Sequence, residues 1–342
     1  MGERRTTVAV LFGGRSSEHE VSCHSADSVL AALDRERYEV VPVRITREGR
    51  WRVGTDGGPE LDVFRALATL RAVDVVFPLL HGPFGEDGTV QAALQSTGVP
   101  YVGNGVLASA VGMDKEFTKK LLAAEGVRVA DSVVLRRGNR SLSQENRDGL
   151  GLPVFVKPAR AGSSIGVSKV DSWDRLDDAV RAANAADPKV LVERAVPGRE
   201  IDVGVLELPD GRLRLSPPLE ISVEGDRGFF DFTAKYHDRG TVFTVPAALS
   251  PRLEARLRAL AAHAFRVLDC RGLLRVDFLL GSGDEPVVNE VNTAPGFTDA
   301  SQYPRMWQAA GLGYGQLLDT LIETALARPA VRPQTRRAAR LG

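Results

Sequence analysis

The chain has 342 residues, of which 43% are hydrophobic and 26% charged, the composition of an ordinary globular protein. This length exceeds what one simple core uses, so we expect two or three domains. The 44 basic and 44 acidic residues balance, which argues against nucleic acid or a membrane as a partner. Two cysteines are too few for a disulfide framework or a thiolate zinc site, and indicate free thiols in a reducing compartment.

No segment reads as a signal for export or membrane insertion. The apolar run at residues 8–12 is too short for a signal peptide. No apolar stretch approaches the roughly 20 residues of a membrane helix. We therefore expect a cytoplasmic protein. Residues 331–342 contain arginines without acidic neighbours, and we interpret them as a flexible basic tail rather than a binding site.

The first third of the chain alternates strand and helix patterns. Residues 8–12, 38–43 and 73–80 are apolar runs typical of buried strands. A helical apolar face follows the first run, formed by Val21, Val29, Leu30 and Leu33. Such alternation favours βαβ units and a mainly parallel sheet. We assign residues 1–112 to this first α/β domain.

Residues 113–200 are predicted to form a small α+β domain. It begins with a helical pattern at residues 115–125. Short strand patterns follow at residues 132–135, 154–157 and 190–193, with a glycine-rich loop and a helix between the last two. The polar residues 136–151 look like a connection.

Residues 201–330 are predicted to form the third domain. A strand pattern at residues 201–206 precedes a polar loop at about residues 224–241. Two strand patterns, at residues 274–280 and 286–291, end the recognisable elements. Between the loop and these strands lies an amphipathic helix whose apolar residues are Leu253, Leu257, Leu260, Ala264, Val267 and Leu268.

Polar residues on the last two predicted strands are the most informative feature. Arg275 and Asp277 alternate on one strand and therefore share a face, as do Glu290 and Asn292 on the next. Hard oxygen ligands suit Mg²⁺, which binds through a few carboxylates plus substrate phosphates. Arg275 could neutralise a transferring phosphoryl group or an oxyanion. Taken alone, the residues equally allow a cross-strand salt bridge on a solvated face.

A second feature runs from a strand end into a loop rich in glycine and serine, residues 157–166. Glycines let the backbone approach an anion, while serine hydroxyls and N–H groups donate to phosphate oxygens. Lys157 adds a positive charge at the strand end. The spacing matches neither the P-loop nor the Rossmann fingerprint, and a loop of this composition is by itself more often a plain turn.

A third feature surrounds the turn after the strand pattern at residues 190–193. Glu193 and Glu200 bracket a segment that contains Pro197 and Gly198. A strand end with exposed backbone could hold the edge of an adenine, and Glu200 could bind ribose hydroxyls. Surface glutamates are common, so this pattern is weak on its own.

These three features, in this order, resemble the nucleotide site of ATP-grasp enzymes, in which ATP lies between two α+β domains under a lid from the central one. The resemblance implies that ATP phosphates are bound by Lys115, Lys157, Ser163, Ser164 and Lys235. It implies a nucleoside held by Glu193, Glu200 and the backbone of Ala195 and Val196. It also implies two Mg²⁺ (or Mn²⁺) ions on Asp277, Glu290 and Asn292.

Further motifs narrow the resemblance to D-alanine–D-alanine ligases. They occupy residues 13–22, 81–88, 113–115, 157–166, 229–236 and 289–297, in the order of that family. The resemblance spans residues 8–327 and implies a three-domain ATP-grasp fold. It implies an ATP-dependent carboxylate–amine ligase that joins two D-alanines through a D-alanyl phosphate, for peptidoglycan precursor synthesis. Because the family is usually dimeric, it also implies a homodimer.

The resemblance assigns residues to the two amino-acid subsites. Glu18 would bind the ammonium of the first D-alanine, with Ser163 and Tyr236 as hydrogen-bonded partners and His81 lining the same subsite. By position alone, Glu18 is more simply a helix-start residue that interacts with the dipole. A lone histidine such as His81 is also more often structural.

The remaining assignments concern the acyl transfer. Arg275 and the backbone N–H of Gly296 would hold the tetrahedral oxyanion, and Ser301 would bind the second carboxylate. Lys235 and Tyr236 belong to the loop that closes over the site in this family and excludes water. The lactate-using relatives lack this pair, so its presence favours an amine acceptor. Either Tyr236 or the leaving phosphate is a candidate base.

The second subsite departs from the family pattern, because Gln302 stands where an apolar residue is usual. A buried amide needs a partner, and a substrate hydroxyl could supply one. A D-serine acceptor, or another specialised dipeptide, is therefore an alternative. The simpler interpretation is that the side chain of Gln302 reaches solvent. A catalytically dead nucleotide-binding module is disfavoured, because the expected phosphate lysines and metal ligands are all present.

Overall fold

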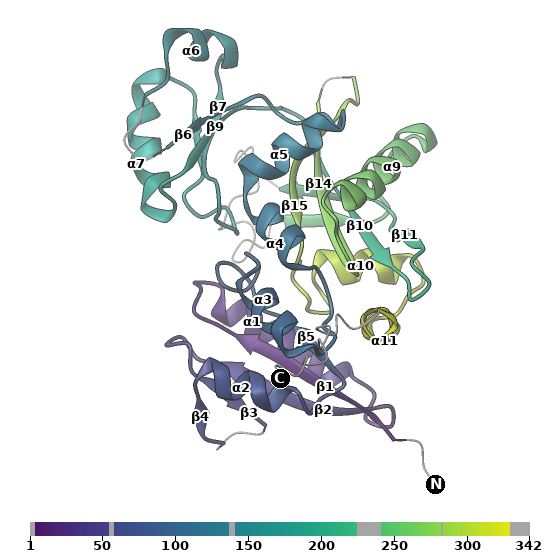
Figure 1. Cartoon of the computed structure of the whole chain (residues 1–342). Helices are drawn as coiled ribbons and strands as arrows, with labels where there is room; N and C mark the ends of the chain where they lie inside the picture. The colour runs from purple at the N-terminus through teal and green to yellow at the C-terminus, as the bar shows by residue number, and fades with distance from the viewer. Residues whose placement is uncertain (1–3, 55–57, 137–140, 224–240, 282, 329–342) are drawn as a thin grey trace, which may run out of the picture.

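The computed structural model describes residues 4–54, 58–136, 141–223, 241–281 and 283–328. Three β-sheets follow one another along the chain, and helices cover them (Figure 1). The predicted α/β class is confirmed. Among the described residues, no helix is both long and apolar enough to cross a bilayer.

The N-terminal sheet has the order β4-β3-β2-β1-β5. Its strands are β1 (Thr6–Gly13), β2 (Tyr38–Ile45), β3 (Trp51–Val53), β4 (Glu60–Leu61) and β5 (Val75–Pro78). As predicted, the central strands are parallel: β1 pairs with both β2 and β5 in that sense. Val8 and Val10 belong to one core cluster, and Ala9 and Leu11 to the cluster on the opposite face. This explains why β1 reads as a continuous apolar run.

The helices of this part are α1 (His19–Ala32), α2 (Val63–Leu70), α3 (Thr89–Thr97) and α4 (Val106–Met113). A turn at Gly13 and Gly14 joins β1 to α1, with φ angles of 89° and 99°. A side chain at Gly13 would place its Cβ 2.2 Å from the carbonyl oxygen of Ile45. Only glycine fits there, and the tight turn brings Glu18 to the end of the sheet.

The central sheet has the order β6-β9-β7-β8, and all its pairs are antiparallel. Its elements are β6 (Ser132–Leu135), α6 (Gln144–Leu150), β7 (Val154–Pro158), β8 (Ser168–Val170), a 3₁₀ helix (Trp173–Arg175), α7 (Leu176–Ala186) and β9 (Val190–Arg194). The prediction that residues 136–151 are only a connection is wrong. The Ser143 hydroxyl caps α6 by accepting from the N–H of Asn146, and Leu150 is buried.

The C-terminal sheet has the order β13-β12-β10-β14-β15, with β11 paired to β10. Its strands are β10 (Arg199–Glu207), β11 (Leu213–Leu215), β12 (Leu219–Val223), β13 (Thr241–Thr244), β14 (Leu273–Leu280) and β15 (Pro286–Asn292). The associated helices are α5 (Lys115–Ala124), α9 (Pro251–Val267), α10 (Gln302–Ala309) and α11 (Tyr314–Ala327).

The alternation of β14 separates core from site. Leu274, Val276 and Phe278 belong to the core cluster that includes Leu257 of α9. Arg275 and Asp277 therefore project from the opposite face of the sheet. The same cluster contains Leu122 and Val127, so the segment around α5 packs on the C-terminal sheet. Domain boundaries at residues 112, 200 and 330 remain a prediction.

Candidate active site

Two cavities meet at Lys115 and Glu290. The larger has a volume of about 630 Å³ and lies between the central and C-terminal sheets. The smaller has a volume of about 370 Å³ and lies between the N-terminal part and the C-terminal sheet. Lys115, Ala161, Gly162 and Glu290 line both cavities. They therefore form one site with two compartments.

Lys115 and Lys157 are two of the basic residues that line the larger cavity. Lys157, at the end of β7, places Nζ 2.7 Å from Glu193 Oε1 and donates to Asn289 Oδ1 at 3.2 Å. Lys115, at the start of α5, donates from Nζ to the carbonyl oxygen of Ala161 at 2.9 Å. Its Nζ also lies 3.6 Å from Glu290 Oε2. Two ammonium groups on the wall of one cavity suit a polyphosphate.

Glu193 is buried between two lysines. Besides Lys157, it meets Lys119, whose Nζ lies 2.8 Å from Glu193 Oε2. Burial raises the pKa of Glu193, but the two lysines lower it by more than burial raises it, so the pKa stays below its usual value. Burial also lowers the pKa of Lys119 more than Glu193 raises it. Sequence reasoning missed Lys119, although it lies one helical turn after Lys115 on the same face.

The turn after β9 completes the larger cavity. Ala195, Val196 and Glu200 line it, so the structure brings all the residues expected for the nucleoside to one place. A side chain at Gly198 would put its Cβ 1.7 Å from the carbonyl oxygen of Leu280. Glycine therefore lets this turn lie directly on the end of β14.

Neighbouring serines in the loop after β7 serve different compartments. Ser163 lines the smaller cavity and Ser164 the larger. Both have left-handed backbones, with φ angles of 52° and 55°. This conformation costs roughly 1–3 kcal/mol for each residue that is not glycine. A hydrogen bond from Ser163 Oγ to Glu18 Oε1 helps to hold the loop in this state.

Glu18 is the N-cap residue of α1, but its side chain makes no capping hydrogen bond. Its backbone N–H donates to Ser16 Oγ at 3.2 Å, and that hydroxyl donates to the carbonyl oxygen of His81 at 2.6 Å. The carboxylate is buried and lines the smaller cavity. A helix-start role therefore does not account for its contact with Ser163.

His81 is buried beside the same cavity. Its Nδ1 lies 3.1 Å from the carbonyl oxygen of Ala294 and 3.4 Å from Glu86 Oε1, while Nε2 lies 3.3 Å from Ser25 Oγ. Burial lowers the pKa of His81, but Glu86 raises it above the ordinary value. Glu86 was not singled out from the sequence, although it lies within the motif at residues 81–88.

Arg275 is buried and fully engaged on one edge. Its Nε and Nη2 donate to the two oxygens of Asp277 at 2.7 and 2.6 Å. Nε also lies 3.3 Å from Asp202 Oδ2. Burial opposes the charge of Arg275, but Asp277 and Asp202 raise its pKa above the usual value. The alternative of a cross-strand salt bridge on a solvated face is not what the structure shows: Arg275 and Asp277 form a buried, bidentate pair within one strand.

The proposed metal ligands share one face of two neighbouring strands. Asp277 is paired in register with Glu290, and Arg275 with Asn292. Within the described ranges, no three His, Cys, Asp or Glu side chains are grouped as a metal site. Glu290 and Asn292 line the smaller cavity and offer a carboxylate and an amide oxygen to Mg²⁺, as part of a shell that phosphates and waters complete. Asp277 would add a second carboxylate, whose two oxygens also accept hydrogen bonds from Arg275. The residues present are therefore suited to a metal that arrives with ATP.

The far end of the smaller cavity is the start of α10. Ser301 is the N-cap residue of this helix, and its Oγ lies 2.7 Å from Thr298 Oγ1. A Cβ at Gly296 would lie 3.3 Å from Ser301 Oγ, so the two residues are adjacent. A helix N-terminus favours negative charge. This end of the cavity can therefore receive a carboxylate.

Comparison with known proteins identifies the family. Residues 7–104 match the family described as D-ala D-ala ligase N-terminus, and residues 121–323 match D-ala D-ala ligase C-terminus. The chain belongs to the D-alanine–D-alanine ligase family. The D-alanine–D-alanine ligase of Nocardia farcinica is 55% identical over an alignment of 356 positions, which covers 95% of this chain and 98% of that protein. The enzyme of that name from Rhodococcus opacus is 52% identical, covering 96% and 99%.

Solved structures agree with this assignment. The VanG D-Ala:D-Ser ligase from Enterococcus faecalis superposes with a TM-score of 0.82 at 34% identity, covering 94% of this chain and all 100% of that one. The D-alanine–D-alanine ligase from Bacillus anthracis complexed with ATP superposes with a TM-score of 0.78 at 31% sequence identity. The match covers 94% of this chain and 97% of that one. Another structure of the Bacillus anthracis enzyme is also 34% identical. The ATP-grasp fold is confirmed. The D-Ala:D-Ser ligase is 34% identical to this chain, whereas the relatives at 52% and 55% identity are D-alanine–D-alanine ligases.

Gln302 of this ligase has a partner inside the protein. Its Oε1 accepts a hydrogen bond from Arg275 Nη1 at 2.8 Å, and it lines the smaller cavity. Because arginine only donates, the carbonyl side of the amide must face it. The side chain is partly exposed, and its carbonyl oxygen is turned toward Arg275. The protein itself therefore satisfies the amide oxygen of Gln302, and a substrate hydroxyl is not needed for that atom.

Two expected residues of the ligase cannot be placed. Lys235 and Tyr236 lie outside the described residues. Their roles remain predictions from the family resemblance. All the other expected site residues line one of the two cavities except Asp277, whose carboxylate is bound by Arg275.

Proposed function

We propose that this chain joins two D-alanines to D-alanyl-D-alanine with ATP, for peptidoglycan precursor synthesis. Membership of the ligase family supports this reaction class. The observation that carries it is the meeting of the two cavities at Lys115 and Glu290. It allows a phosphoryl group of a nucleotide in one compartment to reach a carboxylate in the other.

The larger cavity is the proposed ATP site. Glu193 and Glu200, with the backbone of Ala195 and Val196, would hold the nucleoside. The phosphates would be bound by Lys115, Lys157, Ser164 and Lys235, whereas Ser163, expected from the sequence to join them, lines the smaller cavity. The charge of the two described lysines supports this orientation, because Lys115 lies on the wall shared by the two cavities and Lys157 lines the larger one.

The smaller cavity is the proposed site of both amino acids. Glu18 would bind the first ammonium, supported by Ser163 and Tyr236, with His81 beside it. The first carboxylate would then lie toward Lys115 and attack the γ-phosphorus of ATP, and ADP would leave with the electron pair. The product of this step is a D-alanyl phosphate.

The second step is acyl transfer. The amine of the second D-alanine would attack the acyl carbon, and inorganic phosphate would leave with the C–O electron pair. Arg275 and the N–H of Gly296 would hold the oxyanion, while Ser301 and the start of α10 would receive the second carboxylate. The proton lost by the amine would go to Tyr236 or to the leaving phosphate.

Asp277, Glu290 and Asn292 would hold two Mg²⁺ (or Mn²⁺) ions together with the phosphates. Bound metal would neutralise charge on the transferring phosphoryl group. We further propose three domains, bounded near residues 112, 200 and 330, a cytoplasmic location and a homodimer. Support for these comes from the three sheets and from the family resemblance.

The reaction can be tested by ADP release with Mg-ATP and D-alanine, D-serine, D-lactate or L-alanine, alone and in pairs. Product masses would be read alongside. We expect D-alanyl-D-alanine at the highest turnover. If a mixed product dominates, the acceptor assignment fails, and if no pair releases ADP, the ligase assignment fails.

A further inference from the structure

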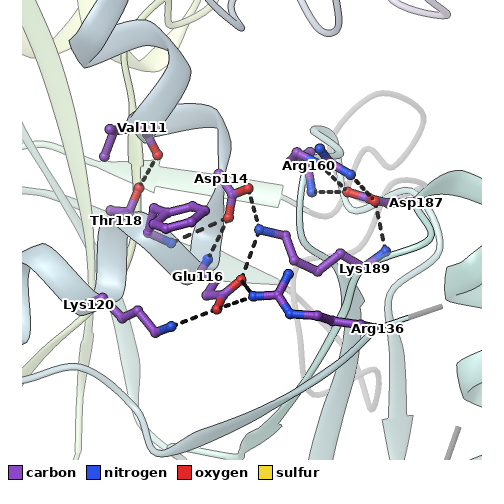
Figure 2. A network of polar contacts seen from close by, with 10 residues as sticks. Val111, Asp114, Glu116, Thr118, Lys120, Arg136, Arg160, Asp187 and Lys189 are labelled. Carbon is purple, nitrogen blue, oxygen red and sulfur yellow. Dashed lines mark hydrogen bonds and ion pairs between the residues drawn. The ribbon is translucent and has the colours of Figure 1, made fainter. Parts of the chain in front are cut away.

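A buried lysine that sequence reasoning missed contacts the residues on both sides of Lys115. Lys189, at the edge of β9, directs Nζ toward Asp114 Oδ2 and lies 3.0 Å from Glu116 Oε2 (Figure 2). All three side chains are buried. One cation therefore joins the residue before the proposed phosphate lysine to the residue after it.

Asp114 fixes the start of the helix that carries Lys115. It is the N-cap residue of α5, and its Oδ1 accepts from the N–H groups of Glu116 and Phe117 at 3.1 and 3.4 Å. Lys189 binds the other carboxylate oxygen. Its Nζ also lies 4.8 Å from the centre of the Phe117 ring, a cation–π distance. Lys189 thus contacts both the cap residue and the first turn of the helix.

The backbone closes a ring between Lys189 and Lys115. The N–H of Lys115 donates to the carbonyl oxygen of Ala159 at 3.0 Å, and the N–H of Ala159 donates to that of Lys189 at 2.9 Å. Lys115 Nζ continues to the carbonyl oxygen of Ala161 at 2.9 Å. A shift of Lys189 would therefore move Ala159, and with it the carbonyl groups of Ala159 and Ala161 that bind Lys115.

The same corner anchors the serine loop. Arg160 donates to Asp187 from its backbone N–H and from Nε, each at 2.9 Å, and from Nη2 at 2.8 Å (Figure 2). Asp187 also accepts from the N–H of Lys189 at 2.9 Å. Burial raises the pKa of Asp187, but Arg160 lowers it below the usual value. Arg160 and Asp187 thus fix the part of the loop that precedes Ser163 and Ser164.

The two carboxylates differ in what else compensates them. Glu116 also pairs with Lys120 and Arg136, at 2.7 and 2.8 Å, and both partners are largely exposed. Within the described ranges, the one ion pair of Asp114 is with Lys189. Removing Lys189 would therefore leave Asp114 buried without its counter-ion, whereas removing Lys120 would leave Glu116 paired.

We propose that Lys189 is a positioning residue for the binding of ATP phosphates, acting through Asp114 and the backbone of Ala159 on Lys115 and the serine loop. This rests on the proposed role of the larger cavity as the ATP site. A purely structural ion pair would lower thermal stability without a selective effect on phosphates. The two cases therefore differ in which part of ATP is affected.

The test compares Lys189→Met with Lys120→Met, which removes a charge from the same network at the surface. Steady-state kinetics give KM for ATP and for D-alanine, and calorimetry gives the affinity for a non-hydrolysable ATP analogue and for adenosine. We expect Lys189→Met to weaken the affinity for the analogue by about tenfold. A misplacement of about 1 Å in an active site can cost up to about a hundredfold in rate, and the displacement of Lys115 expected here is smaller. Adenosine affinity should not change, and Lys120→Met should resemble the wild type.

Equal loss of adenosine and analogue affinity, or an unchanged analogue affinity, would overturn the proposal. If Lys189→Met does not fold, Asp114→Asn replaces it, because asparagine keeps the cap but not the charge. Lys189→Arg should recover much of the analogue affinity. A Lys115→Met variant separates the two claims: wild-type analogue affinity there would refute the phosphate role of Lys115 itself.

Discussion

The carbonyl oxygen of the Gln302 side chain lies 2.8 Å from Arg275 Nη1 and accepts its hydrogen bond. The opposite edge of the guanidinium is bound by Asp277. Arg275, the proposed oxyanion residue, is therefore held from two sides.

Gln302→Leu should lower kcat without changing the ratio of D-alanine to D-serine use. The substitution leaves a buried N–H of Arg275 without its acceptor, which typically costs about 1–3 kcal/mol. Acceptor kinetics with both amino acids provide the measurement. Gln308→Leu, at an exposed position of the same helix, is the control. A ratio that moves toward D-alanine would restore the D-serine interpretation.

Glu18→Gln should raise KM for the first D-alanine about tenfold or more, because a hydrogen bond to a charged group contributes roughly 1.5–3 kcal/mol. The affinity for an ATP analogue should change little. Glu20→Gln is a matched control on the same helix, since Glu20 is exposed and pairs with Arg47. An equal rise in KM for Glu20→Gln would show that the effect is on α1 as a whole.

Glu116 predicts a pH-dependent loss of stability. Burial raises its pKa, but Lys120, Lys189 and Arg136 lower it from 4.5 to about 2. A depressed pKa contributes stability that is present above 4.5 and is lost as pH falls toward 2. Glu116→Gln should therefore be less stable than the wild type at pH 7, with a difference that shrinks below pH 4.5. Chemical denaturation at several pH values measures this, and a constant difference would contradict it.

Glu290→Gln should raise the Mg²⁺ concentration needed for half-maximal activity at least about tenfold, since it removes one of few carboxylate ligands. Titration of Mg²⁺ at saturating ATP provides the measurement. Glu285→Gln is the control, because Glu285 is exposed and pairs with Arg256 just before the same strand. If both variants required the same Mg²⁺ as the wild type, Glu290 would not be a metal ligand.

Much of the molecule follows from local sequence. The β1 strand, the Gly13–Gly14 turn and the alternation of Arg275 with Asp277 depend on periodicity and on glycine alone, and the structure has all three. The order of the motifs predicted nearly all the other site residues, and the structure gathers these residues around two cavities.

The missed features depend on distant contacts. Lys119 and Lys189 read as surface lysines, because their partners Glu193 and Asp114 lie more than 70 residues away. Gln302 finds Arg275 only when the start of α10 packs beside β14. The short α6 was missed because its seven residues carry few apolar side chains.

The adjacent placement of Ser163 and Ser164 in separate compartments has an energetic consequence. A loop that contacts both ligands gives each a coupling to the other, and linkage requires the factor to be the same in both directions. If an ATP analogue raises the affinity for D-alanine by some factor, D-alanine must raise the affinity for the analogue by the same factor. Paired calorimetric titrations would read it, and Ser163→Ala should reduce it from either side.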